Sequence, residues 1–432
     1  MMRPPRAQFK RSRRRLAAAI TLAFALWQTP ALAAEPPLGA SLDGLIAHAR
    51  AHNPELAASR LEAAAARERV EPAAALPDPR FELELMDFTN TMNPGRSASL
   101  IPGEVGATRY RIVQMLPFAG KRELRGQVAQ ALADRSDSVS AAARLKVEGA
   151  IKTAYARHYQ ASGQVRILRE TIALVEGLEQ IVLTRYGLGL VPQQDAIQVQ
   201  GELTSLKIDV AEAERRRIDA VAKLNALLPR APDAPLAEPA VLPPLPPALT
   251  LAALIEDAAA HSPEFGREQA ALTAAEHSRA LTYRDRYPDF GVALANNRPR
   301  GGRDSWDLMI ELNIPLQQAS RRAREREAER RVEAAEAQRN ATAARLSGRI
   351  GELTAAIDTR RDQARLLRDT LLPQAEANLD AAQAGYESGN VNFNTLIEAE
   401  RRILRTRLAL LDAEVEARAG LAELEQLVGA PL

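Results

Sequence analysis

Histidine is the residue type in this sequence best suited to binding a metal ion, and it occurs five times, as His48, His52, His158, His261 and His277. His48 and His52 are four residues apart, so in a helix they share one face and could bind a transition metal together. A closed site needs further converging ligands, and the sequence does not indicate them. His52 and His261 recur at equivalent positions of two related segments, which favours a structural role at a helix boundary. We therefore predict no metal centre.

Nucleophiles and cofactor motifs are also missing from the sequence. The chain has no cysteine, which excludes disulfides, thiolate metal sites, cysteine nucleophiles and an acylated cysteine as a lipid anchor. It contains no Walker loop and no HExxH, GxSxG or GxGxxG motif. The mixed-charge run at 321–339 is typical of a solvated helix face with ion pairs four residues apart, rather than of an interaction tail. The sequence therefore predicts no enzyme and no cofactor.

Composition and charge narrow the class of protein. The chain has 432 residues, of which 46% are hydrophobic and only 4% aromatic, and this favours slender, closely packed helices. Residues 1–33 hold seven bases and no acid, so 57 bases less these seven leave 50 against 55 acids. The net charge of +2 thus belongs to the precursor, and no nucleic-acid partner is indicated.

Residues 1–33 have the features of a cleavable signal peptide. A basic start precedes an apolar run at 16–27, and small residues at Ala31 and Ala33 predict cleavage after Ala33. The segment SRRRL at 12–16 also resembles a twin-arginine signal, and an uncleaved anchor is the other alternative. Beyond this segment no run of eighteen apolar residues occurs, so no transmembrane helix is expected.

The remaining chain is a duplication. The segment beginning at Leu45 matches the one beginning at Leu254, and a break at 185–198 matches a break at 385–398. We predict repeat 1 at 34–228, with a helix at 41–72, a β-hairpin at 80–117 and a helical hairpin at 119–228. A proline-rich linker at 229–249 precedes repeat 2 at 250–432, with a helix at 251–285, a β-hairpin at 288–316 and a helical hairpin at 318–428.

The long helices and the strands both indicate an assembly. A helix of about 68 residues spans roughly 100 Å, and its partner after the break covers about half of it. The helix that opens each repeat is the natural cover for the remainder. The helix after the first break keeps a coiled-coil-like spacing of apolar residues from Leu203 to Leu227, with Arg217 as the exception. The strands alternate apolar and polar residues over about ten positions, which suits either a membrane-spanning strand or an ordinary two-sided sheet. Four strands cannot close a barrel, so two chains would supply eight strands and three chains twelve.

The order of these motifs resembles the TolC family of outer membrane efflux proteins. The resemblance rests on NPEL at 53–56 and SPEF at 262–265, LPDP at 76–79, PFAGKRELR at 117–125 and the two tyrosine-glycine breaks. PFAGKR resembles the CzcC-type heavy-metal branch more than the multidrug branch. The resemblance implies a mainly α fold with a small β part, forming a homotrimer. Its twelve-stranded β-barrel in the outer membrane would continue into an α-helical barrel in the periplasm.

The resemblance also assigns roles to the breaks. It places Gly189, Leu190, Val191, Gly389 and Val391 at hairpin tips that meet a periplasmic adaptor. Glycine suits such turns, because it ends a helix in the left-handed conformation without steric cost, and a plain turn would explain the glycines equally. Exposed apolar side chains at the apex favour partner contact.

A periplasmic gate is implied beside these tips, with Asp195, Tyr386 and Glu398 holding the tunnel mouth closed. Val391 stands where the resemblance would place an arginine, and Thr395 where it would place an acid. The resemblance therefore does not carry an ion-paired lock over to this chain.

The predicted function is a passive outer membrane exit duct. An inner-membrane pump, RND-type and exporting heavy-metal cations, would deliver substrate through the adaptor. The alternatives are a duct for multidrug efflux or type I secretion, a periplasmic adaptor, and a soluble coiled-coil scaffold. An adaptor normally has one helical hairpin with compact β domains, whereas this chain has two hairpins.

Overall fold

The structure, a computed structural model, describes residues 38–92, 95–239 and 241–432. The predicted signal peptide at 1–33 lies outside the described residues. Repeat 1 contains seven elements: α1 (Leu42–His52), α2 (Pro54–Arg67), α3 (Val70–Ala74), β1 (Arg80–Met86), β2 (Ala107–Leu116), α4 (Lys121–Gly187) and α5 (Gln193–Leu227). Repeat 2 contains α6 (Leu251–His261), α7 (Pro263–Arg284), β3 (Asp289–Pro299), β4 (Ser305–Asn313), α8 (Gln318–Leu366), the π-helical turn η1 (Leu367–Leu371), α9 (Leu372–Glu387) and α10 (Phe393–Val428).

The helix that opens each repeat is broken, which differs from the continuous helices predicted at 41–72 and 251–285. Asn53 adopts extended backbone between α1 and α2, and Ser262 does so between α6 and α7. Each is followed by a proline, whose ring disfavours the helical conformation of the preceding residue. Asn53 also caps α2, because its side chain accepts hydrogen bonds from the backbone N–H groups of Glu55 and Leu56.

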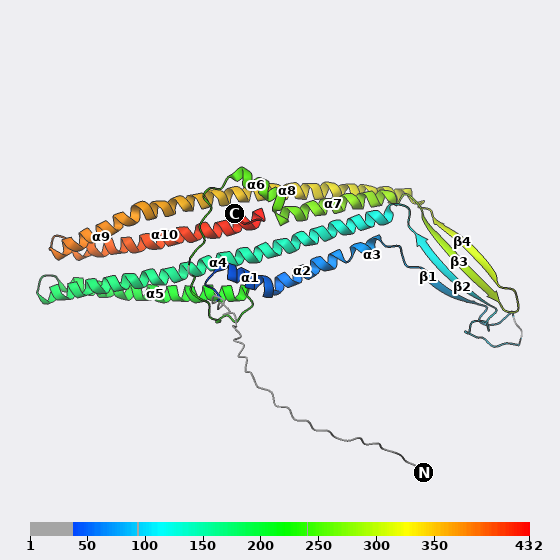
Figure 1. Ribbon diagram of the computed structural model, residues 1–432, viewed down its shortest axis with the longest axis horizontal. Helices are drawn as coiled ribbons and strands as arrows, with labels where there is room; N and C mark the ends of the chain where they lie inside the picture. Colours follow the sequence, from blue (N-terminus) through cyan, green and yellow to red (C-terminus); the bar gives the residue numbers. More distant parts are fainter. Residues whose placement is uncertain (1–37, 93–94, 240) are drawn as a thin grey trace, which may run out of the picture. The chain divides into compact units, whose positions relative to one another are not determined.

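The long helix also differs between the repeats. α4 runs unbroken for 67 residues, whereas its counterpart passes through the π-helical turn η1 before continuing as α9. Pro373 is the second residue of α9, just after η1, and proline cannot supply the backbone N–H that a regular helix requires. In both repeats the chain then reverses, so α5 packs along α4 and α10 packs along α8 and α9 (Figure 1).

The opening helices cover the part of the long helices that the second arms leave free. α1, α2 and α3 contact α4, and α6 and α7 contact α8. The two repeats have equivalent cores at these junctions. Leu45, Ala49 and Leu224 are buried together in repeat 1, as are Leu254, Ala258 and Leu424 in repeat 2.

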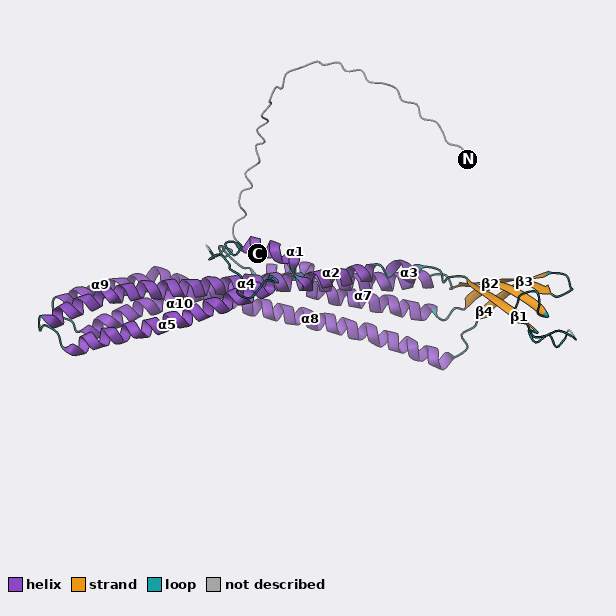
Figure 2. Cartoon of the chain, turned by 90° about the horizontal axis from the view of Figure 1, so that it is seen from below, coloured by secondary structure: helices purple, strands orange, loops and turns teal. Residues whose placement is uncertain are grey.

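All four strands join in one antiparallel sheet in the order β1-β2-β3-β4, the only sheet among the described residues (Figure 2). On one face the charges pair across strands, with Glu82 opposite Arg111 and Glu84 opposite Arg109. The other face is apolar and exposed. Met309, which interrupts the alternation of β4, shares the polar face with Asp307 and Glu311, and lies opposite Ala293.

The described parts of the linker, 229–239 and 241–249, contact both repeats. The Tyr155 hydroxyl of α4 lies 3.4 Å from the carbonyl oxygen of Val241 and can donate to it, and Arg361 of α8 donates to the carbonyl of Pro246. Among the described residues, helices long and apolar enough to cross a bilayer do not occur.

Candidate gate at the tips of the helical hairpins

The two hairpin turns have the same backbone geometry. Gly189 and Gly389 both adopt positive φ, +73° and +79°. In the first turn, Leu190 N–H donates to the carbonyl of Arg185 at 2.9 Å and Gly189 N–H donates to that of Tyr186 at 2.9 Å. In the second turn, Asn390 and Gly389 make the same bonds to Gly385 and Tyr386. This is a Schellman motif, which requires a left-handed residue where each glycine stands.

The predicted adaptor-contact residues divide by exposure. Gly189, Leu190 and Gly389 are exposed, and so is Leu188. Val191 is half-buried and packs against the apolar cluster inside the hairpins. Val391 is also half-buried, and it occupies the space that a side chain at Gly385 would need, since a Cβ there would lie 2.6 Å from Val391 Cγ2. The arginine expected at this position is thus replaced by a packing residue.

Tyr386 and Asp195, two of the three predicted gate residues, are brought together. Tyr386 of α9 is 3% exposed, and its hydroxyl donates a hydrogen bond to Asp195 Oδ2 of α5 at 3.3 Å. Burial, followed by the charge and hydrogen bond of Asp195, raises the pKa of Tyr386 to about 12. The hydroxyl therefore remains a donor at every physiological pH. This bond connects the second hairpin to the first.

Arg185, in the last turn of α4, was not singled out from the sequence. Its guanidinium lies 5.1 Å from the centre of the Tyr386 ring, and its Nη1 donates to the carbonyl of Glu387 at 2.5 Å. The first hairpin thus supplies a cation at the contact, where the family resemblance would place one on the second. The available signal was its place in the RYG sequence, because a base in the last turn of a helix can reach free carbonyls.

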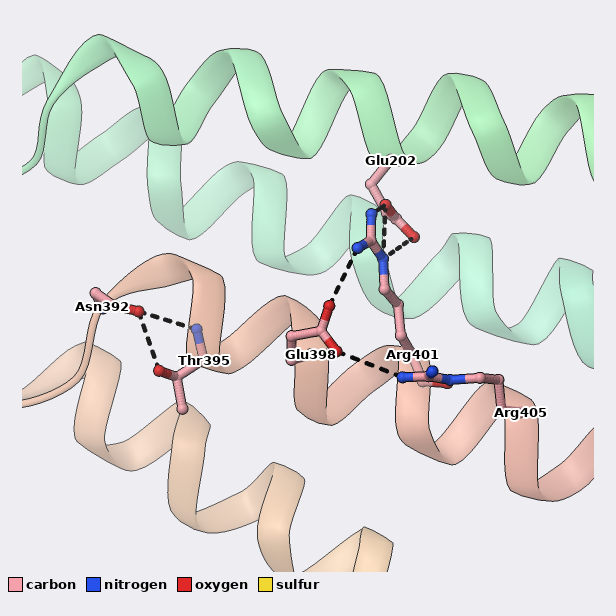
Figure 3. Close-up of polar contacts among 6 residues, drawn as sticks. All are labelled: Glu202, Asn392, Thr395, Glu398, Arg401 and Arg405. Carbon is pink, nitrogen blue, oxygen red and sulfur yellow. Dashed lines mark hydrogen bonds and ion pairs between the residues drawn. The ribbon is translucent and has the colours of Figure 1, made fainter.

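Glu398, the third predicted gate residue, does not join the contact between Tyr386 and Asp195. Its carboxylate pairs with Arg401 at 3.2 Å and Arg405 at 3.4 Å on its own helix, α10 (Figure 3). Arg401 also binds Glu202 of α5 at 2.5 Å. These two arginines and Glu202 were missed, because their pairing depends on which faces of α5 and α10 meet.

Thr395, where an acid was expected, belongs to the cap of α10. Its N–H and its hydroxyl each donate to Asn392 Oδ1 at 3.0 Å (Figure 3). Asn392 thus satisfies a free backbone donor at the start of the helix.

The histidines do not converge. The rings of His48 and His52 stack with centroids 4.4 Å apart, and His52 Nδ1 lies 3.0 Å from the carbonyl of His48. His261 makes the equivalent contact with Asp257 in repeat 2. Within the part of the chain that the structure describes, no group of three histidine, aspartate or glutamate residues could hold a metal ion.

Comparison with known proteins gives one family. The profile described as "Outer membrane efflux protein" matches residues 45–229 and 254–430. The cobalt-zinc-cadmium resistance protein CzcC of Cupriavidus metallidurans is 23% identical over 404 residues, covering 90% of each chain. The outer membrane protein OprJ of Pseudomonas aeruginosa is 26% identical over 317 residues, covering 68% of this chain and 63% of OprJ.

Two solved structures share the fold. Crystal structures of CusC align with a TM-score of 0.76 at 17% identity, covering 90% of this chain and 92% of CusC. The outer membrane protein VceC of Vibrio cholerae aligns with a TM-score of 0.75 at 18% identity, covering 90% of this chain and 96% of VceC. With both repeats matched by the family profile, the chain belongs to the outer membrane efflux protein family, whose members are TolC-like channels and not enzymes.

Proposed function

We propose that three copies of this chain form one exit duct, with twelve strands closing a β-barrel in the outer membrane and the helical hairpins forming a periplasmic tunnel. The observation that carries this proposal is the sheet. Within the described part of the chain, β1 and β4 each pair on one side only. In lipid such open edges are not tolerated, so the sheet must close with other copies.

The exposure of the sheet supports a lipid contact. Trp306, Leu308 and Ile310 of β4 are 68–71% exposed, and Phe81 and Leu294 share their face. Exposing this apolar face to water would cost free energy, whereas contact with the lipid chains of a bilayer would avoid that cost. The opposite face, with its paired glutamates and arginines, would line a water-filled lumen.

The helices carry a separate signal for neighbouring copies. Ile197, Ile208 and Ile218 of α5 are 60%, 64% and 61% exposed, and their spacing keeps them on one side of the helix. An unpartnered apolar row on a long helix is expected where another hairpin packs. We assign this row to contacts between copies.

At the opposite end of the helices from the strands, the tips Gly189, Leu190, Val191, Gly389 and Val391 would meet the adaptor, and through it an inner-membrane pump. The substrate class that the comparisons favour is a heavy-metal cation, because CzcC matches over 90% of this chain. A multidrug duct is the second candidate, which the match to OprJ supports. Export of the chain itself would use the predicted signal peptide.

The test is export in cells that lack their own duct and carry the cognate adaptor and pump. We expect the wild-type chain to raise tolerance to Co²⁺, Zn²⁺ or Cd²⁺. Gly189→Asp combined with Gly389→Asp should abolish this, because it puts two charges on each chain's docking turns. Gly177→Asp with Gly348→Asp is the matched control, since these exposed helical glycines have no neighbour within 4 Å of an added Cβ.

The trimer in isolated outer membranes is measured in parallel. Export by the tip variant from a correctly inserted trimer would contradict the docking role. Tolerance to drugs but not to metals would favour the second candidate.

A further inference from the structure

Two buried carboxylates lie inward from the tips, one on the second arm of each hairpin. Glu400 of α10 is 2% exposed and Glu202 of α5 is 8% exposed. Glu400 is surrounded in sequence by the buried residues Leu396, Ile397 and Ile403 of the hairpin cluster. Its Oε2 accepts no hydrogen bond from any described residue. A carboxylate in such a place is costly when ionised and unpaired.

Arg401 neutralises only one member of this pair. Its Nε lies 3.2 Å from both carboxylate oxygens of Glu202 and its Nη2 lies 2.5 Å from Oε2 (Figure 3). The same guanidinium also donates to Glu398 at 3.2 Å, and Glu398 is shared with Arg405. Arg401 therefore binds α5 to α10 from the partly exposed side, while Glu400 beneath it has no such partner.

We infer that Glu400 positions the second hairpin against the first in a proton-dependent way. When Glu400 is protonated, it is a neutral group that the apolar interior accepts, and Arg401 holds Glu202 across the junction. When Glu400 loses its proton, a buried negative charge without a hydrogen-bond donor at Oε2 is repelled by the charge of Glu202, and α10 moves away from α5. The structural contact lies within one chain, so only its consequence for conduction rests on the proposed function.

The charges around Glu400 fix the sign of the effect. Burial, and then the charge of Glu202, raise its pKa to about 7, against an opposing effect of Arg401. Among the described residues no charge from α4 or α9 acts on it, and these helices contribute apolar side chains such as Leu178 and Leu379 to the surrounding cluster. The ordinary pKa of glutamate is about 4.3. The contact is thus strongest at acidic pH and weakens as pH rises through about 7.

The natural absence of cysteine makes a direct test simple. Gln200→Cys on α5 and Arg402→Cys on α10 place two spin labels at exposed positions outside the network. Full-length protein in nanodiscs, diluted with unlabelled chain, is measured by pulsed electron resonance from pH 5.5 to 8.5. We expect the α5–α10 distance to increase with a midpoint near 7. Glu400→Gln, a neutral isostere, should hold the short distance at every pH.

Three further variants separate this inference from a general loss of structure. Glu398→Gln should keep the titration, because Glu398 does not act on Glu400. Glu202→Gln should move the midpoint to lower pH, since it removes the repelling charge. Arg401→Gln should move it to higher pH. A titration that persists in Glu400→Gln, or none in the wild type, would overturn the inference. Channel currents recorded separately would report failure of the proposed duct without affecting the distances.

Discussion

At the scale of single residues, Tyr386 is the centre of the candidate gate. Its hydroxyl donates a hydrogen bond to Asp195, and the guanidinium of Arg185 lies over its ring. The ring also packs against Phe393 in a T-shaped arrangement, with centroids 5.6 Å apart. Removing only the hydroxyl should therefore weaken the contact between the two hairpins without disturbing the packing of the ring. A hydrogen bond to a charged group contributes about 1.5 kcal/mol or more, so Tyr386→Phe should raise the open population about tenfold.

Single-channel conductance in planar bilayers measures this change. Arg185→Ala should open the mouth further, because it removes both the cation over the ring and the bond to the Glu387 carbonyl. In a Glu400→Gln background, the Tyr386→Phe effect should be the same from pH 6 to 9, since the pKa of Tyr386 is about 12. Conductance unchanged in both variants would remove these residues from the gate.

The sequence predicted part of this site and missed part for a physical reason. Asp195 and Tyr386 could be assigned because a recurring break marks their place in the chain. Arg185, Glu202 and Arg401 could not, because contacts across about 200 residues depend on how two long helices are rotated about their axes. The rotation depends on how all the buried side chains of each helix pack together, so it cannot be read from any single residue.

At the scale of elements, the order of helices and strands was predictable from periodicity, whereas several details were not. The family predicted from these elements is confirmed by the profile match. The breaks at Asn53 and Ser262 were missed although a proline follows each, since the apolar pattern continues across them. The pairing of β2 with β3, which joins the hairpins of both repeats, was outside what local alternation could show.

Two glycines at helix ends give a matched pair for stability. Gly189 has φ +73° with open space around it, so Gly189→Ala should cost about 1 to 2 kcal/mol of backbone strain. Gly429 ends α10 with φ +92°, and an added Cβ would lie 2.2 Å from the His261 carbonyl oxygen. Gly429→Ala must also push α10 away from the α6–α7 junction. We expect a clearly larger drop in apparent melting temperature for Gly429→Ala than for Gly189→Ala, and equal drops would contradict this packing.

At the scale of the whole molecule, the free edges of the sheet predict which surfaces meet. Single cysteines scanned along β1 (Arg80–Met86), combined with Met309→Cys on β4, should form disulfides between copies on oxidation. Gel electrophoresis under non-reducing conditions should then show a covalent trimer for at least one β1 position. The matched control pairs the same β1 positions with a cysteine on β3, which is not an edge. Cross-linked dimers without trimers would contradict the proposed twelve-stranded barrel.

Three polar contacts at the tips and just inward from them join the two hairpins of one chain: Tyr386 to Asp195, Arg185 to Glu387, and Arg401 to Glu202. A ring of six tips built from three such chains therefore has two kinds of seam. Three of the contacts between neighbouring hairpins lie within a chain and contain these bonds. The other three lie between chains and do not contain them. When a partner docks, hairpins of different chains should therefore separate before hairpins of the same chain do. At acidic pH, where Glu400 is protonated, the two hairpins of each chain would then move together as one rigid pair.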